Sequence, residues 1–197
     1  MGKSIAINAG SSTLKYKLFQ MPEEKVLSSG AIDRIGLGAS EVSIKYGDGK
    51  KFKDTEDIDN HEQAIQLVLD KLLSLDIIKD YNEITGVGHR IVAGGELFPD
   101  SVVIDDDVIK KIESLTEFAP LHEPAALLGI KAFKKILPNT ISVAVFDTSF
   151  HTTLPEVNYM YSLPYEYYQS IKFVSMVLTE PATVMFLLGQ LLYWANH

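Results

Sequence analysis

Short runs of alternating or continuous apolar residues fill the first third of the chain and predict β-strands. These runs lie at 4–9, 14–18, 26–35, 41–46 and 51–53. Between the last two, Gly47-Asp48-Gly49 supplies the residues that a tight hairpin turn requires. A small polar loop joins the first two runs, so we expect those two strands to be neighbours. The opening of the chain therefore predicts a meander of antiparallel strands.

A helical period replaces the strand pattern after Asn60. Asp59 and Asn60 provide side chains for an N-cap, and apolar residues recur over 61–73 at the spacing of one helix face. We expect this helix to pack on the sheet and His61 to lie at the surface of its first turn. Between residues 84 and 146, the apolar pattern predicts strands beginning at 84 and 102, helices over 105–115 and 125–137, and a buried strand over 141–146.

The composition narrows the class of protein. With 197 residues, 46% of them hydrophobic, the chain can bury the core of one large domain or of two small ones. A net charge of −8 argues against a nucleic-acid binder, because no basic surplus is present to neutralise phosphates along a duplex. The absence of cysteine excludes disulfides and thiolate zinc sites. The start of the chain lacks a signal-peptide pattern, and we expect a cytoplasmic protein.

The loop between the first two strands has the composition of an anion site. It runs Asn8-Ala9-Gly10-Ser11-Ser12-Thr13-Leu14-Lys15. Its small residues let backbone N–H groups approach an anion, its hydroxyls add donors, and Lys15 adds a positive charge that phosphate oxygens favour. The alternative is a polar β-turn followed by an ordinary exposed lysine.

Three further side chains are candidates for chemistry. Arg90 lies near the end of a predicted strand and suits bidentate recognition of a carboxylate or phosphate; alternatively, it forms an ion pair with Glu96 or another nearby acid. Asp147 follows the buried strand 141–146, where α/β proteins place their sites; alternatively, it caps the next turn. His122 lies between two prolines on a rigid loop, and by itself it predicts only a solvated loop residue.

Taken together, these segments resemble the acetate kinase family. The matching segments are Asn8-Ala9-Gly10-Ser11-Ser12-Thr13-Leu14-Lys15, Gly88-His89-Arg90-Ile91-Val92 with Gly94-Gly95-Glu96, Ala119-Pro120-Leu121-His122, Phe146-Asp147-Thr148-Ser149-Phe150-His151 and Tyr161-Ser162-Leu163-Pro164-Tyr165. They follow the family's order and spacing, over residues 3 to about 171. The resemblance implies an α/β fold of the actin-like ATPase, or ribonuclease H-like, type: a mixed sheet with flanking helices. It also implies that residues 1–171 form the N-terminal domain of a two-domain enzyme.

The resemblance implies reversible phosphoryl transfer from ATP to acetate, giving acetyl phosphate and ADP, with Mg²⁺ as the metal. Such a reaction brings two anions into contact, so catalysis consists mainly of positioning and charge neutralisation. The implied roles are magnesium binding for Asn8, contact with nucleotide phosphates for Ser11, Thr13 and Lys15, binding of the acetate carboxylate for Arg90, a methyl pocket for Val92 and Leu121, donation to phosphoryl oxygens for His122, and an essential carboxylate near the reacting centre for Asp147.

The residues after 171 depart from the family. The segment 172–197 is an atypical hydrophobic tail, and Glu180 with Pro181 makes it too interrupted for a confident membrane span. One hypothesis is a frameshift, because 180–186 can be back-translated, one base earlier, into Gly-Thr-Ser-His-Arg-Tyr-Val, which is the family's continuation. The other is a natural tail whose apolar residues pack on the domain or drive self-association.

Two functional hypotheses of different class follow. In the first, the chain is an acetate kinase by descent that does not turn over as written. In the second, it is a catalytically silent half-domain that binds phosphate, carboxylate or a partner. The expected partners are ATP with acetate or another short-chain carboxylate, without nucleic acid or membrane, and a homo-oligomer through the tail or an exposed face of the domain.

Overall fold

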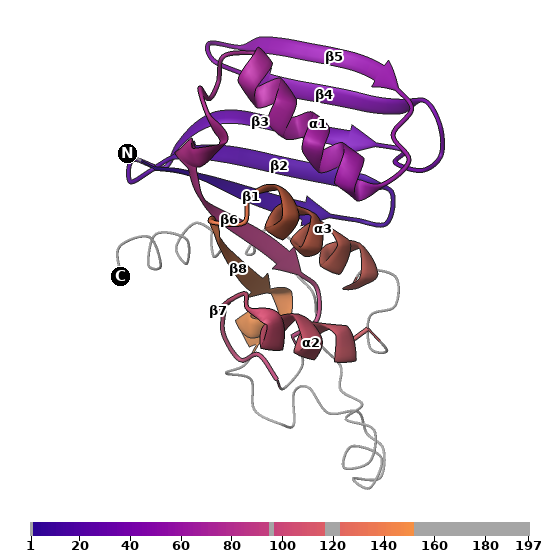
Figure 1. Cartoon of the computed structure of the whole chain (residues 1–197), viewed down its shortest axis with the longest axis vertical. Helices are drawn as coiled ribbons and strands as arrows, with labels where there is room; N and C mark the ends of the chain where they lie inside the picture. The colour runs from indigo at the N-terminus through magenta and orange to yellow at the C-terminus, as the bar shows by residue number, and fades with distance from the viewer. Residues whose placement is uncertain (1, 95–96, 117–122, 152–197) are drawn as a thin grey trace, which may run out of the picture.

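One mixed β-sheet runs through the molecule (Figure 1). The computed structural model of the protein describes residues 2–94, 97–116 and 123–151. In these ranges the sheet has eight strands in the order β5-β4-β3-β2-β1-β6-β8-β7. The strands are β1 (Lys3–Ala9), β2 (Thr13–Gln20), β3 (Lys25–Asp33), β4 (Ser40–Tyr46), β5 (Lys50–Glu56), β6 (Ile84–Ile91), β7 (Val102–Val103) and β8 (Ile141–Phe146).

The sheet has an antiparallel half and a largely parallel half. Strands β1 to β5 form an antiparallel meander, which confirms the prediction made from the hydrophobic pattern. Strands β1, β6 and β8 are parallel, and the short β7 adds to β8 in the antiparallel sense. The carboxyl ends of β1, β6 and β8 consequently meet at one edge of the sheet, where open α/β sheets place their ligands.

Three α-helices and two 3₁₀ turns complete the described part of the chain. They are α1 (His61–Ser74), η1 (Tyr81–Glu83), α2 (Asp106–Ser114), α3 (Glu123–Ile136) and η2 (Asp147–His151). The side chains of Asn60 and Asp105 accept hydrogen bonds from backbone N–H groups in the first turns of α1 and α2, so both helices begin close to where the sequence predicts. None of the helices in the described ranges is long and apolar enough to span a bilayer.

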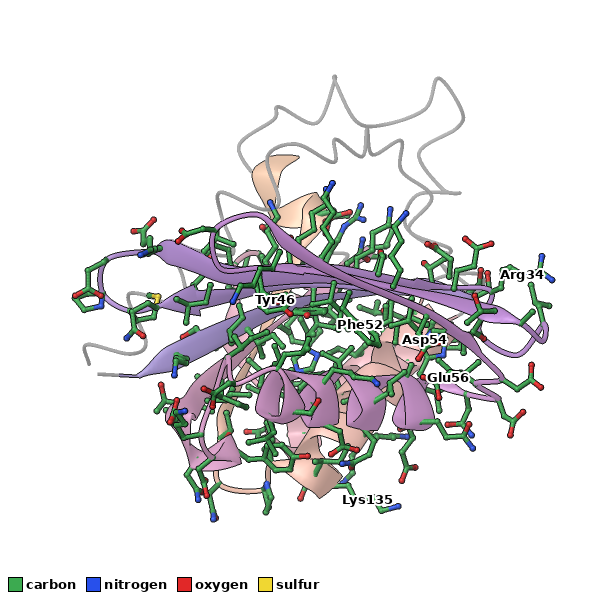
Figure 2. All side chains as sticks on the ribbon, turned by 90° about the horizontal axis from the view of Figure 1, so that it is seen from above. Arg34, Tyr46, Phe52, Asp54, Glu56 and Lys135 are labelled. Carbon is green, nitrogen blue, oxygen red and sulfur yellow. The ribbon has the colours of Figure 1, made fainter. Side chains whose placement is uncertain are left out.

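Helices α1 and α3 cover one face of the sheet (Figure 1). Alternation along β2 places Leu14, Tyr16 and Leu18 under α1, whereas Lys15 and Lys17 point to the opposite side. Figure 2 shows α1 packed beneath a sheet whose other face carries side chains of its own. The helix-covered face therefore contains the main core, and the far face of the meander contributes little to it.

A second core cluster lies under α2 and α3 beside β6 and β8. The rings of Phe98 and Phe146 stack there with centroids 4.4 Å apart. A Cβ on Gly94 would come within 2.8 Å of the Phe146 ring, so the segment after β6 can lie this close to the ring only because residue 94 is glycine. This packing holds the end of β6 against the end of β8.

His61 is not a surface residue, so the prediction for this position was wrong. It is 5% exposed, and its Nε2 lies 2.6 Å from the carbonyl oxygen of Gly10, to which it donates a hydrogen bond. The first turn of α1 therefore lies against the loop between β1 and β2. A local pattern cannot reveal this contact, because the two groups are 51 residues apart in the sequence.

His89 on β6 is buried without a hydrogen-bond partner for its Nε2 among the described residues. Its ring meets Phe133 of α3 edge-on, with centroids 5.5 Å apart. Burial away from water disfavours the charged imidazolium and lowers the pKa of His89 to about 3. The folded protein therefore keeps this histidine neutral at pH values where an unfolded chain protonates it.

We expect His89 to make the fold less stable in mild acid. Because its folded pKa lies below the ordinary 6.5, stability is fully present above pH 6.5 and is lost as the pH falls toward 3. Between pH 7 and pH 5 the loss is about 2 kcal/mol. Urea unfolding of the wild type and of His89→Leu at both pH values measures this loss of unfolding free energy. The carboxyl groups titrate in both proteins, so their contribution cancels in the comparison. An equal loss in both proteins would contradict the assignment.

Candidate active site

The candidate site lies where β6 and β8 end side by side. Arg90 is the penultimate residue of β6, and it is paired in register with Val145 of β8. Asp147 follows β8 directly and begins the turn η2. Parallel pairing thus brings the two residues to the same edge of the sheet, although they are 57 positions apart in the sequence.

Arg90 and Asp147 form a bidentate ion pair. The Arg90 Nε donates to both carboxylate oxygens of Asp147 at 3.1 Å, and Nη2 donates to Oδ2 at 2.8 Å. The side chain of Asp147 is 0% exposed and that of Arg90 is 15% exposed. Charged groups this deeply buried require such a partner, and removing one of them leaves an uncompensated charge. The sequence identified both residues as candidates but did not reveal that they contact each other.

Two buried side chains hold the segment that follows β6. The backbone N–H of Ala93 donates to Glu123 Oε1 at 2.9 Å, and that of Gly94 donates to Thr148 Oγ1 at 3.0 Å. Glu123, the first residue of α3, is 0% exposed, and Thr148 of η2 is 4% exposed. Neither residue is among the candidates predicted from the sequence. The available signal for Glu123 was an acidic residue at the start of a predicted helix, where the helix dipole favours it.

Glu123 has an unusual electrostatic environment. Burial raises its pKa to about 7, the Ala93 N–H opposes this rise, and the negative charge of Asp147 adds to it. Its second oxygen, Oε2, is buried and has no hydrogen-bond partner in the described part of the chain. A carboxyl with this pKa exchanges a proton near neutral pH, and it is close enough to Asp147 for the two negative charges to interact.

The loop between β1 and β2 lies at the same edge. Asn8 pairs in register with Lys15, while the preceding Ile7 pairs with His89 on the helix-covered face. Because successive side chains alternate between faces, Asn8, Lys15 and Arg90 all lie on the opposite face of the sheet. The Gly10 N–H donates to the Thr13 carbonyl at 2.8 Å and closes the loop, in which Ser11 is exposed and Thr13 half-buried.

The structure therefore brings together several of the residues that the sequence selected. Arg90, Asp147, Asn8 and Lys15 come to one edge, and the half-buried Val92 follows β6 there. Leu121, His122 and Glu96 lie outside the described residues.

The oxygen donors at this edge suit a magnesium ion that arrives with a phosphate ligand. Within the described ranges, no group of three or more histidine, cysteine or acidic side chains could form a metal cage. Mg²⁺ does not need such a cage, because it keeps several waters and takes only one or two protein oxygens together with substrate phosphates. The amide oxygen of Asn8 beside the β1–β2 loop fits that mode of binding.

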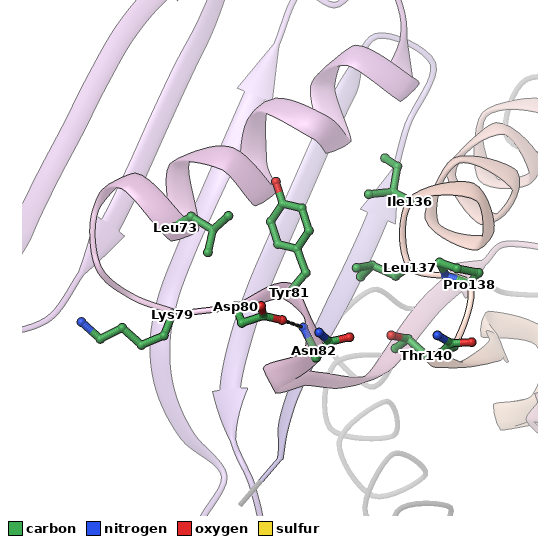
Figure 3. Close-up of a pocket in the computed structure, with 10 residues that line it drawn as sticks. Leu73, Lys79, Asp80, Tyr81, Asn82, Ile136, Leu137, Pro138 and Thr140 are labelled. Atoms are coloured by element: carbon green, nitrogen blue, oxygen red, sulfur yellow. Dashed lines mark hydrogen bonds between the residues drawn. The ribbon is translucent and has the colours of Figure 1, made fainter.

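A separate pocket of about 330 Å³ opens at the other end of the sheet (Figure 3). It lies among the ends of α1 and α3 and the turn η1, and is lined by Leu73, Lys79, Asp80, Tyr81, Asn82, Ile136, Leu137, Pro138, Asn139 and Thr140. Since η1 precedes the start of β6 and Arg90 lies near its end, this pocket is not part of the candidate site.

Comparison with known proteins identifies close relatives. The sequence profile of the Acetokinase family matches residues 3–174. The chain is 72% identical over 169 residues to the acetate kinase of Fructilactobacillus sanfranciscensis and 63% identical over 169 residues to that of Enterococcus faecalis. Each alignment covers 86% of this chain and 43% of the relative, so the chain spans less than half the length of these relatives.

Solved structures agree with the sequence comparison. The acetate kinase of Porphyromonas gingivalis superposes with a TM-score of 0.84 at 40% identity, over 88% of this chain and 44% of that protein. A propionate kinase of Francisella tularensis gives 0.83 at 30% identity, over 90% and 45%. Both have the actin-like ATPase, or ribonuclease H-like, fold, which confirms the predicted fold class. With a family match over most of its length, this chain belongs to the acetokinase family.

Proposed function

We propose that this chain is the carboxylate-binding part of an acetate kinase, which transfers the γ-phosphoryl group of ATP reversibly to acetate. The observation that carries the proposal is the buried Arg90–Asp147 pair at the edge that also holds the β1–β2 loop. The reaction joins two anions, so a site for it needs a fixed cation for the acceptor and a donor-rich loop for the phosphates. This edge of the sheet supplies both kinds of group.

Arg90 is the proposed anchor for the acetate carboxylate. A guanidinium presents five N–H donors in a rigid plane, so it can address two carboxylates at once, and Asp147 fixes its orientation. Val92 follows two residues later and supplies apolar surface for the methyl group, together with Leu121. Glu123 and Thr148, by holding the Ala93 and Gly94 amides, keep this segment in position.

The phosphate side of the site belongs to the β1–β2 loop and to His122. We assign Ser11, Thr13 and Lys15 to the nucleotide phosphates and Asn8 to Mg²⁺, which supplies further neutralisation of phosphate charge when it is bound. His122 is the proposed donor to the transferring phosphoryl oxygens, and Asp147 is the carboxylate nearest the reacting centre. The hydrogen bond from the Gly10 N–H to the Thr13 carbonyl closes the loop as a tight turn. The support for the assignment is the hydroxyl-rich composition of the loop and its place at the same edge as Arg90.

The acyl group is assigned only as a short-chain carboxylate. One of the similar structures is named a propionate kinase and another an acetate kinase. A single methylene in an apolar pocket changes discrimination by only about 1–3 kcal/mol, so acetate, propionate and butyrate are all candidate acceptors.

We expect the 197-residue chain to bind but not to turn over, because it spans less than half of its enzymatic relatives. The catalytically silent half-domain is thus the second candidate function. The test is an assay for acetyl phosphate with the pure chain, ATP, Mg²⁺ and acetate. ATP-dependent product that is abolished in Asp147→Asn would overturn the expectation.

Arg90→Gln should weaken acetate binding at least about tenfold, since a charge-assisted hydrogen-bond pair is lost. Arg34, in the turn between β3 and β4, is the only other arginine, so Arg34→Gln is a control with the same change of charge. Acetate titrations followed by the amide NMR shifts of Ile91 and Val92 measure the effect. Arg90→Lys keeps a cation opposite Asp147 and guards against unfolding; it should bind acetate more weakly than the wild type. Equal affinity in all four proteins would refute the assignment.

Glu123 should make the fold less stable as the pH rises. Its folded pKa of about 7 lies above the ordinary 4.5, so its stabilising contribution is fully present below pH 4.5 and is lost as the pH rises through 7. Between pH 5 and pH 7 the loss is about 2 kcal/mol relative to Glu123→Gln, which keeps an oxygen for the Ala93 N–H. Urea unfolding of the two proteins at both pH values measures it. A constant difference in stability between them would show that Glu123 is already ionised.

A further inference from the structure

Five lysines stand on the face of the meander that no described helix covers. They are Lys15 and Lys17 on β2, Lys45 on β4, and Lys51 and Lys53 on β5, and all are exposed. We call this group the lysine face. Figure 2 shows nitrogen-tipped side chains on the side of the sheet away from α1, while the labelled Phe52, Asp54 and Glu56 lie on the α1 side.

The strand register arranges these lysines in two rows. One row runs Lys17–Ser29–Lys45–Lys51, and the next runs Lys15–Ala31–Ser43–Lys53. Adjacent strands are about 4.8 Å apart, so the ammonium groups surround a floor of the small residues Ser29, Ala31 and Ser43. The row beyond carries Asp33 and Glu41, and the positive charge is therefore concentrated on the first two rows.

The lysines of this face are not paired with the nearby acids Asp33 and Glu41 or with any other described carboxylate, although the chain is acidic, with a net charge of −8. Six of the ten other lysines in the described ranges pair with an acid: Lys3, Lys79, Lys111, Lys131, Lys134 and Lys135. The five on the lysine face form no ion pair with any described residue, and Lys45 lies directly opposite Lys51. Like charges in that position destabilise a sheet, so the arrangement has a cost that an anionic ligand would offset.

The lysine face is continuous with the candidate site. Lys15 belongs both to the second row and, through its pairing with Asn8, to the edge that holds Arg90. An anion on this face therefore lies on the same surface as the β1–β2 loop. A patch of two rows on a strongly acidic chain is too small for a duplex, which needs a longer track of cations. It suits a short chain of phosphates, which compact ammonium groups bind well.

We propose that the lysine face captures the oligophosphate chain of a phosphorylated anion and passes it to the adjoining site. The passage to the site rests on the proposed function, whereas the capture does not. A chain with a net charge of −8 repels anions at long range, and a local positive field counters this repulsion by raising the association rate about 10- to 1,000-fold. The ligand is a nucleoside triphosphate or an inorganic oligophosphate, which share this chemistry.

Two triple variants with the same change of charge test the capture. The face variant is Lys45→Gln/Lys51→Gln/Lys53→Gln, which leaves the site residue Lys15 intact. The control is Lys131→Gln/Lys134→Gln/Lys135→Gln on α3, whose lysines are also exposed and lie on the other side of the sheet, as Lys135 shows in Figure 2. The probe is inorganic tripolyphosphate, titrated calorimetrically into the full chain at low salt and again at high salt.

We expect the face variant to bind tripolyphosphate about tenfold more weakly than the wild type, with a shallower dependence on salt. The control should stay within about twofold of the wild type. Equal losses in the two variants, or none in either, would overturn the proposal, since the effect would then follow net charge or be absent. Circular dichroism confirms that both variants are folded before titration.

Two further titrations of the same variants, with ATP and with acetate, complete the test. The first identifies the source of the phosphate chain, and the second separates this proposal from the proposed function. If ATP loses affinity in parallel with tripolyphosphate, the nucleotide is a ligand of the face; if only tripolyphosphate does so, the ligand is inorganic. Acetate binding should be unchanged in the face variant. If the face variant loses affinity for tripolyphosphate while Arg90→Gln retains its affinity for acetate, capture by the lysine face is supported and the proposed function is refuted. If the face variant retains its affinity for tripolyphosphate while Arg90→Gln loses its affinity for acetate, the proposed function is supported and capture by the lysine face is refuted.

Discussion

The buried pair between Arg90 and Asp147 is the interaction on which the site depends. A carboxylate that is fully shielded from water is tolerated only opposite a well-oriented cation, so the pair ties the end of β6 to the end of β8. Its geometry in turn requires the parallel register of those strands and the close approach of Gly94 to Phe146. The same ion pair therefore joins the two strand ends and fixes the orientation of the guanidinium that we propose as the acetate anchor.

Around this pair, the two faces of the sheet perform different tasks. The face under α1 and α3 holds the apolar core and excludes water so completely that His89 stays neutral. The other face carries Asn8, Lys15 and Arg90 at the site edge. The other four lysines of the lysine face lie beyond that edge. Alternation along each strand allows one sheet to do both, since every second side chain is available for each task.

The family assignment and the structure agree on the fold. The similar proteins extend well beyond the part that this chain matches. In the proposed function, Arg90 at this edge is the anchor for the carboxylate and the β1–β2 loop contacts the phosphates. A site that neutralises two anions can be shared between two parts of a protein, because the groups that hold each anion make separate contacts. The proposed role of this chain is therefore binding and orientation of the acceptor, with phosphate contacts along its open face.

Sequence alone determined the local elements and the family. Hydrophobic periods located the meander and the helices, Asn60 marked the start of α1, and the motifs around Arg90 and Asp147 indicated an acetate kinase. Tertiary structure alone decided that Arg90 meets Asp147, that Glu123 reaches the Ala93 amide, and that His61 is buried against Gly10. The reason is physical. Periodicity and caps reflect contacts within a few residues, whereas these three contacts join groups 30 to 57 positions apart, and only the packed sheet brings them together.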